Sequence, residues 1–198
     1  MSALALAAYE PPYTYKDYCA MDDDVRREII DGVIYNMAAP TTTHQRVMAI
    51  ISTRLENFLA GKKCRMFFSP IDVRLDYDKG DYTVVQPDII VVCDRSKIDK
   101  HGIKGAPDLV VEVLSPSSHQ MDRIRKQKKY HKSGVREYWI VDPEHKIVQT
   151  FIYEGDKTYT NSYSESDTIQ VQVLPGCEVD LSNVFEDDLL DDNLLDEE

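Results

Sequence analysis

The sequence predicts a mixed α/β (α+β) fold whose core elements follow the order αβββαβ. Apolar residues recur every three or four positions over residues 43–61, as they do on one face of a helix. Three apolar, strand-like segments follow without a helix between them, and a second helical segment precedes the strand "REYWIVD". Strands in direct succession favour antiparallel neighbours, and a helix before the last strand favours a parallel one, so the sheet is predicted to be mixed.

A short helix and a β-hairpin are predicted before this core. The helix in "YTYKDYCAM" has Thr14 as a suitable N-cap. Asp31-Gly32 lies between two apolar runs and is a strong signal for a two-residue hairpin turn. The long helix that follows has Thr43 available as its N-cap and Gly61 as its C-terminal stop.

The remaining elements follow from alternation and from chain breakers. After "SPSS", a helix is predicted that ends at Gly134. Beyond "REYWIVD", the alternating segment "KIVQTFIYEGDKTYTNSYSESDTIQVQV" predicts a C-terminal antiparallel meander with a turn at Glu154-Gly155-Asp156. The core strands are predicted at residues 64–75, 84–92 and 108–114, and the second helix at 118–133.

Length and composition indicate an ordinary globular protein. The 198 residues are 42% hydrophobic and 29% charged, which fits one domain (1–185) followed by an acidic tail (186–198). The longest apolar runs are too short to cross a bilayer. The N-terminal "ALALAA" lacks the basic lead of a signal peptide, so a cytoplasmic protein without a membrane partner is expected.

Charge is distributed unevenly along the chain. The net charge is −12, which argues against non-specific binding of nucleic acid over the whole surface. Eight of the acidic residues lie in the tail "EDDLLDDNLLDEE"; without them, 23 basic residues face 27 acidic ones, a balance of −4. By contrast, "RIRKQKKYHK" (123–132) places six Lys and Arg residues within ten positions. A local basic face is therefore expected on the second helix.

The cysteines and histidines give no sign of a structural metal site. Cys19, Cys64, Cys93 and Cys177 form no Cys-x-x-Cys pair, and the five histidines lack zinc-type spacing. Reduced thiols are expected.

Two carboxylates stand out against apolar strands. Glu112 lies between Val111 and Val113, where an unpaired buried carboxylate would be costly, so it must be exposed on an edge strand, protonated, paired or bound to a metal. Asp88 opens the strand expected to neighbour that of Glu112, and neighbouring strands lie about 4.8 Å apart. Two carboxylates on one face at this spacing can hold one cation. Asp108 is a weaker partner, because it lies four residues from Glu112 on the same strand.

Three further residues are candidates for the same site. Lys126, four residues before Tyr130 and therefore on the same helical face, could stabilise developing charge; the alternative is a solvated helix face. His44 opens the long helix, where a simple surface residue is the alternative. Glu28, before the Asp-Gly turn, is most simply a surface strand residue.

The segments "EIIDG", "VQPDIIVV", "GAPDLVVEVLSPSS" and "GVREYWIVDP" resemble the PD-(D/E)xK nuclease superfamily, and within it the Uma-type restriction endonuclease family. The likeness runs from about Tyr13 to Ile152, and its long motifs are far more specific than a lone Pro-Asp. The resemblance implies a restriction-endonuclease-like core and a metal-dependent phosphodiesterase.

The resemblance implies that Asp88, Glu112 and the backbone carbonyl of Val113 bind Mg²⁺ or Mn²⁺. The superfamily lysine normally follows the acid by two residues, but that position is Leu114 here. In this branch the lysine is displaced onto the following helix, which corresponds to Lys126.

Glu28 and His44 match residues typical of the branch and complete the implied catalytic site. Arg123, Arg125 and Lys128 are the implied contacts to the nucleic-acid backbone. Nuclease folds of this kind often pair two subunits, so a homodimer is expected, with the C-terminal meander as its interface.

DNA endonuclease activity is therefore the leading hypothesis. The first alternative is a nuclease-like fold that binds nucleic acid or a protein partner without cutting. The second is an interaction protein whose tail forms a short amphipathic helix through Leu189, Leu190, Leu194 and Leu195, although a solvated end explains the tail more simply.

Overall fold

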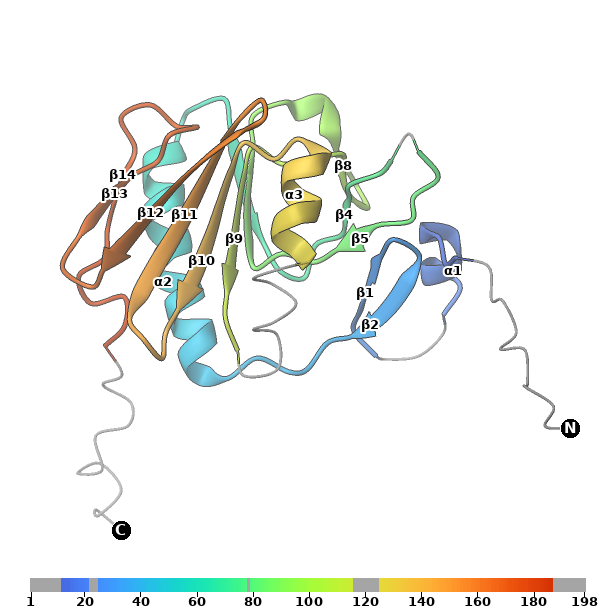
Figure 1. The fold of residues 1–198 in the computed structure, drawn as a ribbon, viewed down its shortest axis with the longest axis horizontal. Coiled ribbons are helices and arrows are strands. Elements are labelled where there is room, and N and C mark those ends of the chain that lie inside the picture. The colour runs from blue at the N-terminus through green and yellow to red at the C-terminus, as the bar shows by residue number, and fades with distance from the viewer. Residues whose placement is uncertain (1–11, 22–24, 78, 116–124, 187–198) are drawn as a thin grey trace, which may run out of the picture.

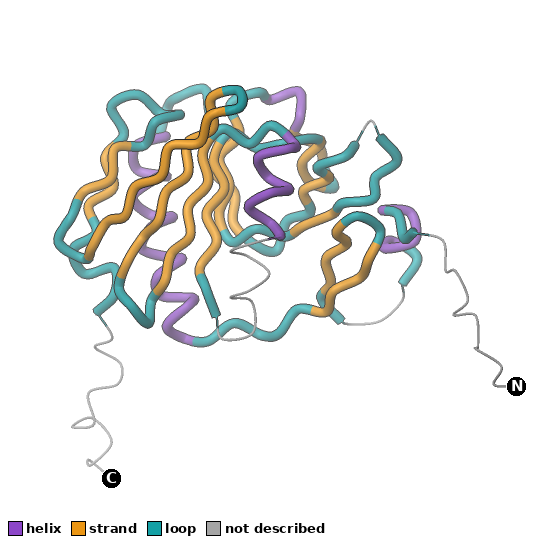
Figure 2. Tube along the Cα trace, viewed as in Figure 1, coloured by secondary structure: helices purple, strands orange, loops and turns teal. Residues whose placement is uncertain are grey.

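The structure is a computed structural model that describes residues 12–21, 25–77, 79–115 and 125–186. Within these residues, the protein is a mixed α/β fold with two six-stranded sheets and one two-stranded sheet (Figures 1 and 2). The predicted mixed sheet is confirmed. The second six-stranded sheet was not predicted.

The larger sheet agrees with the predicted strand directions. β9 (Leu109–Val113) and β10 (Glu137–Asp142) are parallel, with the second helical segment between them. Every other neighbouring pair in this sheet is antiparallel. Its strands in spatial order are β12 (Lys157–Ser164), β11 (Ile147–Glu154), β10, β9, β6 (Ile89–Val92) and β3 (Arg65–Phe68).

The second sheet carries the predicted N-terminal hairpin at one edge. Asp31 and Gly32 form its two-residue turn with φ values of 51° and 79°, as the Asp-Gly signal predicts. β7 (Ile98–Asp99), β8 (Gly102–Lys104) and a short 3₁₀ helix (Arg95–Lys97) were not predicted from the sequence. The strands in spatial order are β2 (Val33–Asn36), β1 (Arg27–Ile30), β5 (Val84–Val85), β4 (Val73–Arg74), β8 (Gly102–Lys104) and β7 (Ile98–Asp99).

Two predicted core strands are wrong in extent, because each divides between the two sheets. The segment 64–75 divides at the cis Ser69-Pro70 bond into β3 and β4, and the segment 84–92 divides at Pro87 into β5 and β6. Proline has no N–H to continue a strand ladder. The second division places Asp88 where the chain passes from one sheet to the other.

The helix ends follow local capping chemistry. α1 (Tyr15–Cys19) begins with a capping box between Thr14 and Asp17, as predicted for Thr14. The prediction of Thr43 as the cap of α2 (Thr42–Leu59) is wrong. Thr41 is the N-cap, and its side chain accepts from the His44 N–H at 3.2 Å. The helix starts directly after Pro40-Thr41, so Thr43 already lies in its first turn.

The second helix is described only in part, as α3 (Gln127–Ser133). It ends at Gly134 in the left-handed conformation (φ 95°), as predicted. Arg123 lies outside the described residues. So do the leucines of the acidic tail, whose described part ends at residue 186.

The central strands of the larger sheet, β6, β9 and β10, are buried on both faces. One face packs against α2 and the C-terminal segment around β13 (Thr168–Gln170) and β14 (Glu178–Asp180). The other face packs against α3 and the second sheet. The predicted meander therefore holds through β12, but its last part leaves the sheet and pairs with β14 instead. Figure 1 shows α2 and α3 on opposite sides of the sheet.

The expectation of four reduced thiols is wrong, because Cys64 and Cys93 form a disulfide. Cys64 directly precedes β3 and Cys93 directly follows β6, and Arg65 pairs with Val92 in the antiparallel register. One step further along this register, the two cysteines face each other. Cys19 and Cys177 are free.

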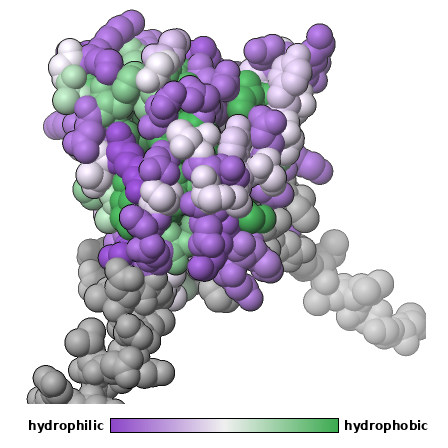
Figure 3. Space-filling model, turned by 90° about the vertical axis from the view of Figure 1, so that its left-hand side faces the viewer, coloured by the Kyte–Doolittle hydropathy of each residue, from purple (hydrophilic) through white to green (hydrophobic). Residues whose placement is uncertain are grey.

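No helix in the described parts of the chain is long and apolar enough to span a bilayer. The side that includes β13 and β14 is mainly hydrophilic, with apolar atoms in small areas (Figure 3).

Candidate functional site

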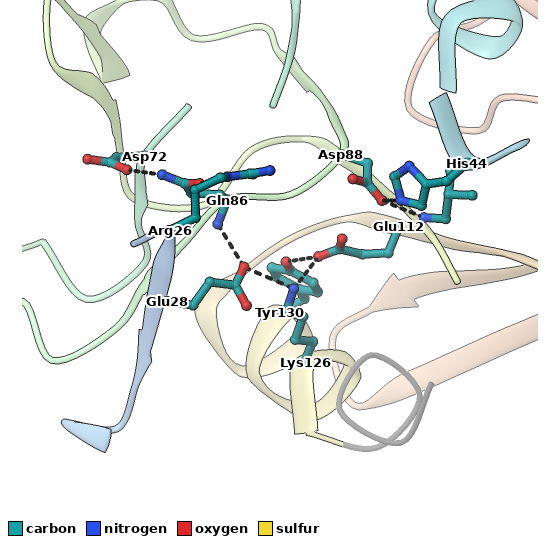
Figure 4. Close-up of polar contacts among 10 residues, drawn as sticks. Arg26, Glu28, His44, Asp72, Gln86, Asp88, Glu112, Lys126 and Tyr130 are labelled. Carbon is teal, nitrogen blue, oxygen red and sulfur yellow. Dashed lines mark hydrogen bonds and ion pairs between the residues drawn. The ribbon is translucent and has the colours of Figure 1, made fainter. Parts of the chain in front are cut away.

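A cleft of about 300 Å³ lies where the two sheets meet beside the start of α2 and the segment leading into α3. It brings together six of the residues singled out in the sequence, and Figure 4 shows five of their side chains by name. The six residues are Glu28, His44, Asp88, Glu112, Val113 and Lys126.

Asp88 directly precedes β6, Glu112 lies on the neighbouring strand β9, and both line this cleft. Ile89 of β6 pairs with Val111 of β9, so Asp88 and Glu112 follow as the next opposed positions. Asp88 Oδ2 accepts a hydrogen bond from the Val113 N–H at 2.7 Å and lies 3.1 Å from His44 Nε2. The Asp88 carboxylate is therefore held by a backbone group and by an imidazole.

Glu112 is buried on an internal strand, with only 3% of its surface exposed, so the edge-strand alternative is wrong. Its Oε1 lies 3.1 Å from Lys126 Nζ and accepts a hydrogen bond from the Tyr130 hydroxyl at 2.6 Å. Asp108 does not line the cleft. Its carboxylate accepts from the Cys93 N–H and contacts Arg136.

Lys126 lies between two carboxylates. Its Nζ is 2.9 Å from Glu28 Oε1 and 3.1 Å from Glu112 Oε1, and all three side chains are about 5% exposed. The solvated-helix alternative for Lys126 is therefore wrong, as is the surface-strand alternative for Glu28. His44 is also buried, at 8% exposure. Burial makes each of these charge contacts stronger than it would be in water.

A second group of polar residues is hydrogen-bonded to Glu28 through Gln86, and it was not predicted from the sequence. Gln86 donates its backbone N–H to Glu28 Oε1 at 2.8 Å. The Gln86 side chain donates to Asp72 and to the Tyr18 hydroxyl, both at 3.0 Å, and accepts from Arg26. The only sequence feature that points to this group is the polar Gln86 within "VVQPDII", and it does not indicate which residues Gln86 contacts.

Burial raises the pKa values of two tyrosines near the site, so their hydroxyls keep their protons even well above neutral pH. Burial and then the nearby charges of Glu112 and Glu28 raise the pKa of Tyr130 well above its usual range. Burial and then the charge of Asp72 raise the pKa of Tyr18 to about 12. Tyr130 is therefore a hydroxyl donor to Glu112 at neutral pH.

The charges of the cleft suit a bound cation. Three carboxylates, those of Glu28, Asp88 and Glu112, face two cationic side chains, Arg26 and Lys126. Among the residues that the structure describes, no three His, Cys, Asp or Glu side chains are grouped closely enough to form a complete metal site. Mg²⁺ does not require one, because it is usually bound by one or two carboxylates together with water and phosphate oxygens.

Two of the three predicted backbone-contact residues lie beside the cleft. Arg125 and Lys128 are exposed, and Arg125 donates to the Tyr35 hydroxyl at 2.5 Å. Tyr35 itself lines the cleft. Two of the three predicted contacts therefore lie near the site, and the third, Arg123, is outside the described residues.

Comparisons with known proteins identify the family. The model of the Uma2 family, described as "Putative restriction endonuclease", matches residues 12–182. "Uncharacterized protein slr1290" of Synechocystis sp. is 29% identical over 179 residues, which cover 87% of this chain and 91% of that protein. A crystal structure described as a "putative nuclease belonging to DUF820", from Anabaena variabilis, has the same fold. Its TM-score is 0.70 at 20% identity, over 88% of this chain and 98% of the other. Because the family match spans most of its length, this chain belongs to the Uma2 family.

Proposed function

We propose that the protein is a Mg²⁺- or Mn²⁺-dependent endonuclease that hydrolyses phosphodiester bonds in DNA. The observation that carries the proposal is the pair Asp88 and Glu112, which line one cleft from adjacent strands beside Lys126. The description of the Uma2 family supports the same chemistry.

Asp88 and Glu112, together with the backbone carbonyl of Val113, would hold the ion. When bound, such an ion lowers the pKa of a water and neutralises charge that develops on the phosphate. A rigid strand positions ligands of this kind better than a loop, which explains why Glu112 stands among valines.

The other residues of the cleft position these groups. His44 and the Val113 N–H fix the direction of the Asp88 carboxylate. Tyr130 does the same for Glu112. Lys126, supported by Glu28, supplies a positive charge close to where a scissile phosphate would bind.

One observation favours a second function, a nuclease-like protein that binds nucleic acid or a protein partner without cutting. Lys126 places an ammonium group directly against Glu112, so the buried carboxylate is already compensated without a metal. Leu114 stands where the superfamily lysine is usual. A protein of this kind has no need to bind a divalent ion.

Metal affinity separates the two functions without any assumption about the substrate. Mn²⁺ is titrated by calorimetry into the wild type, Asp88→Asn and Glu112→Gln, with Asp108→Asn as a control because Asp108 lies on the Pro-Asp motif that does not line the cleft. We expect binding in the wild type and the control, and a loss of at least about tenfold in both cleft variants. Binding that is absent from the wild type, or unchanged in the cleft variants, would contradict the proposed mechanism.

A further inference from the structure

A second pocket, of about 390 Å³, lies between the β1–β2 hairpin and α3. Tyr35 lines both this pocket and the cleft, so the two are adjacent. We call it the basic pocket, because four of its eight lining residues are cationic. Its lining residues are Ile30, Asp31, Val33, Tyr35, Arg125, Lys128, Lys129 and Lys132.

The four cations come from one helical surface. Positions 125, 128, 129 and 132 are three or four residues apart, so their side chains point in similar directions. Lys126 and Tyr130 lie on a different side of the same segment and reach Glu112. The segment therefore presents positive charge to the cleft and to the basic pocket separately.

Most of the positive charge in the basic pocket is uncompensated. Lys129 is paired with Asp31 at 2.5 Å and with Asp76 at 2.9 Å. Arg125 donates to the neutral hydroxyl of Tyr35 and lies over the Tyr35 ring, with its Cζ 5.6 Å from the ring centroid. Within the described parts of the chain, neither Arg125, Lys128 nor Lys132 forms an ion pair. Three cations thus remain available for an anionic ligand.

Apart from Asp31, which is paired with Lys129, the hairpin side of the pocket offers apolar surface that suits the carbon atoms of a nucleotide sugar. Ile30, Val33 and Tyr35 line it from the hairpin, and Val33 is 52% exposed. A phosphate with an attached sugar would place its charge against α3 and its apolar part against Val33 and Tyr35. An inorganic anion would leave this apolar surface unused.

We infer that the basic pocket is a second phosphate subsite, which binds a backbone phosphate of the same nucleic-acid strand whose scissile phosphate lies in the cleft. This inference rests on the proposed function for its substrate. It adds Lys132 and the hairpin residues Val33 and Tyr35 to the expected contacts. It also predicts that the strand crosses the hairpin at Tyr35.

The test compares two double variants with the same change in net charge. Lys128→Gln/Lys132→Gln removes two cations of the basic pocket, and Lys100→Gln/Lys157→Gln removes two exposed cations elsewhere. Binding of a fluorescein-labelled DNA duplex is measured by anisotropy in EDTA, at salt concentrations from 50 to 200 mM.

We expect the pocket variant to bind about tenfold more weakly at 50 mM salt, and the slope of log affinity against log salt to become shallower by about 0.9, corresponding to the loss of one phosphate contact. The control should change both quantities by less than half as much. Equal effects of the two variants, or no DNA binding by the wild type, would overturn the inference.

A Mn²⁺ titration of the same variants distinguishes this inference from the proposed function. The pocket variant should bind Mn²⁺ like the wild type, because neither lysine lines the cleft. If neither the wild type nor the variants bind Mn²⁺ but the pocket variant still loses DNA affinity, the phosphate subsite is supported and the metal-dependent nuclease is contradicted. A pocket variant that loses Mn²⁺ affinity together with DNA affinity has a disturbed cleft, and that result would count against a separate subsite.

Discussion

At the scale of single residues, Lys126 is the group on which the metal-free site depends. It is the ammonium between Glu28 and Glu112, and all three side chains are almost fully buried. Removing one partner of a buried ion pair leaves an uncompensated charge, which is far more costly than losing an exposed pair. Here its removal would leave two buried carboxylates facing each other.

Lys126→Met should therefore lower the free energy of unfolding of the metal-free protein by about 3–5 kcal/mol. Mn²⁺ should restore much of this stability, because a bound cation replaces the missing ammonium, and its affinity should not fall below that of the wild type. Urea denaturation with and without Mn²⁺ measures both effects. Lys128→Met, an exposed neighbour, is the control and should change stability by less than about 0.5 kcal/mol.

A stable Lys126→Met variant would mean that Glu28 and Glu112 are compensated in some other way. Loss of cleavage together with retained Mn²⁺ binding would support the catalytic role of the lysine. Loss of both would instead point to a structural role alone.

The candidate site shows which residues the sequence can predict. Asp88 and Glu112 could be found because a carboxylate in an apolar strand is conspicuous, and strand succession indicated that their strands are neighbours. Gln86, Arg26, Asp72 and Tyr18 could not be found in this way. Their contacts depend on how the second sheet meets the first, and no local pattern encodes that meeting.

At the scale of elements, the amphipathic helix and the hairpin were predictable because each has a local cause. The long helix has its 3.6-residue period, and the hairpin has Asp31-Gly32. Strand ends were predicted less well. Apolar residues continue on both sides of Ser69-Pro70 and of Pro87, so each segment was predicted as one strand, although the chain changes sheets at both places. Strands of two or three residues, such as β7 and β8, are too short to show a period.

The disulfide depends on how two strands, β3 and β6, pair with each other. Cys64 and Cys93 are 29 residues apart, and no sequence motif connects them. They meet because β3 and β6 pair in one particular register. A one-residue slip of that register would turn one side chain to the other face of the sheet.

Thiol titration checks the pairing. In denaturant without a reductant, two of the four cysteines should react, Cys19 and Cys177, and all four should react after reduction. Reduction should lower the free energy of unfolding by about 2–4 kcal/mol, because the unfolded chain regains the entropy of an open loop. Cys64→Ser/Cys93→Ser should resemble the reduced wild type and should not respond to reductant. Four reactive thiols before reduction would contradict the pairing.

At the scale of the whole molecule, the two faces of the larger sheet differ in what covers them and in whether they border the cleft. The face under α3 and the second sheet leads to the cleft, and the other face is closed by α2 and the C-terminal segment. The C-terminal meander was predicted as a dimer interface, but β12 is largely exposed and rich in Ser, Thr and Asn. A polar strand of this kind does not favour an obligate interface, and the homodimer stays a prediction.

Glu137 connects the C-terminal segment to the larger sheet through a buried hydrogen bond. It is fully buried on β10, where Oε2 accepts from the Val173 N–H at 2.9 Å and Oε1 accepts from Trp139 Nε1 at 2.7 Å. Burial raises the pKa of the Glu137 carboxyl, although the hydrogen bonds from Val173 and Trp139 act in the opposite direction. The folded protein therefore holds this proton more tightly than the unfolded chain does.

This difference links stability to pH with a definite sign. Where the folded state binds more protons, the free energy of unfolding falls as pH rises. The contribution of Glu137 is complete below its unfolded pKa and is lost as pH rises through the higher folded pKa. We therefore expect the stability of the wild type relative to Glu137→Gln to decrease from about pH 4.5 upward, and then to level off. Urea denaturation of both proteins between pH 4.5 and 8 measures this difference, in which the repulsion among the other acidic groups cancels. A difference that grows with pH would show that the hydrogen bonds from Val173 and Trp139 outweigh the cost of burying the charge.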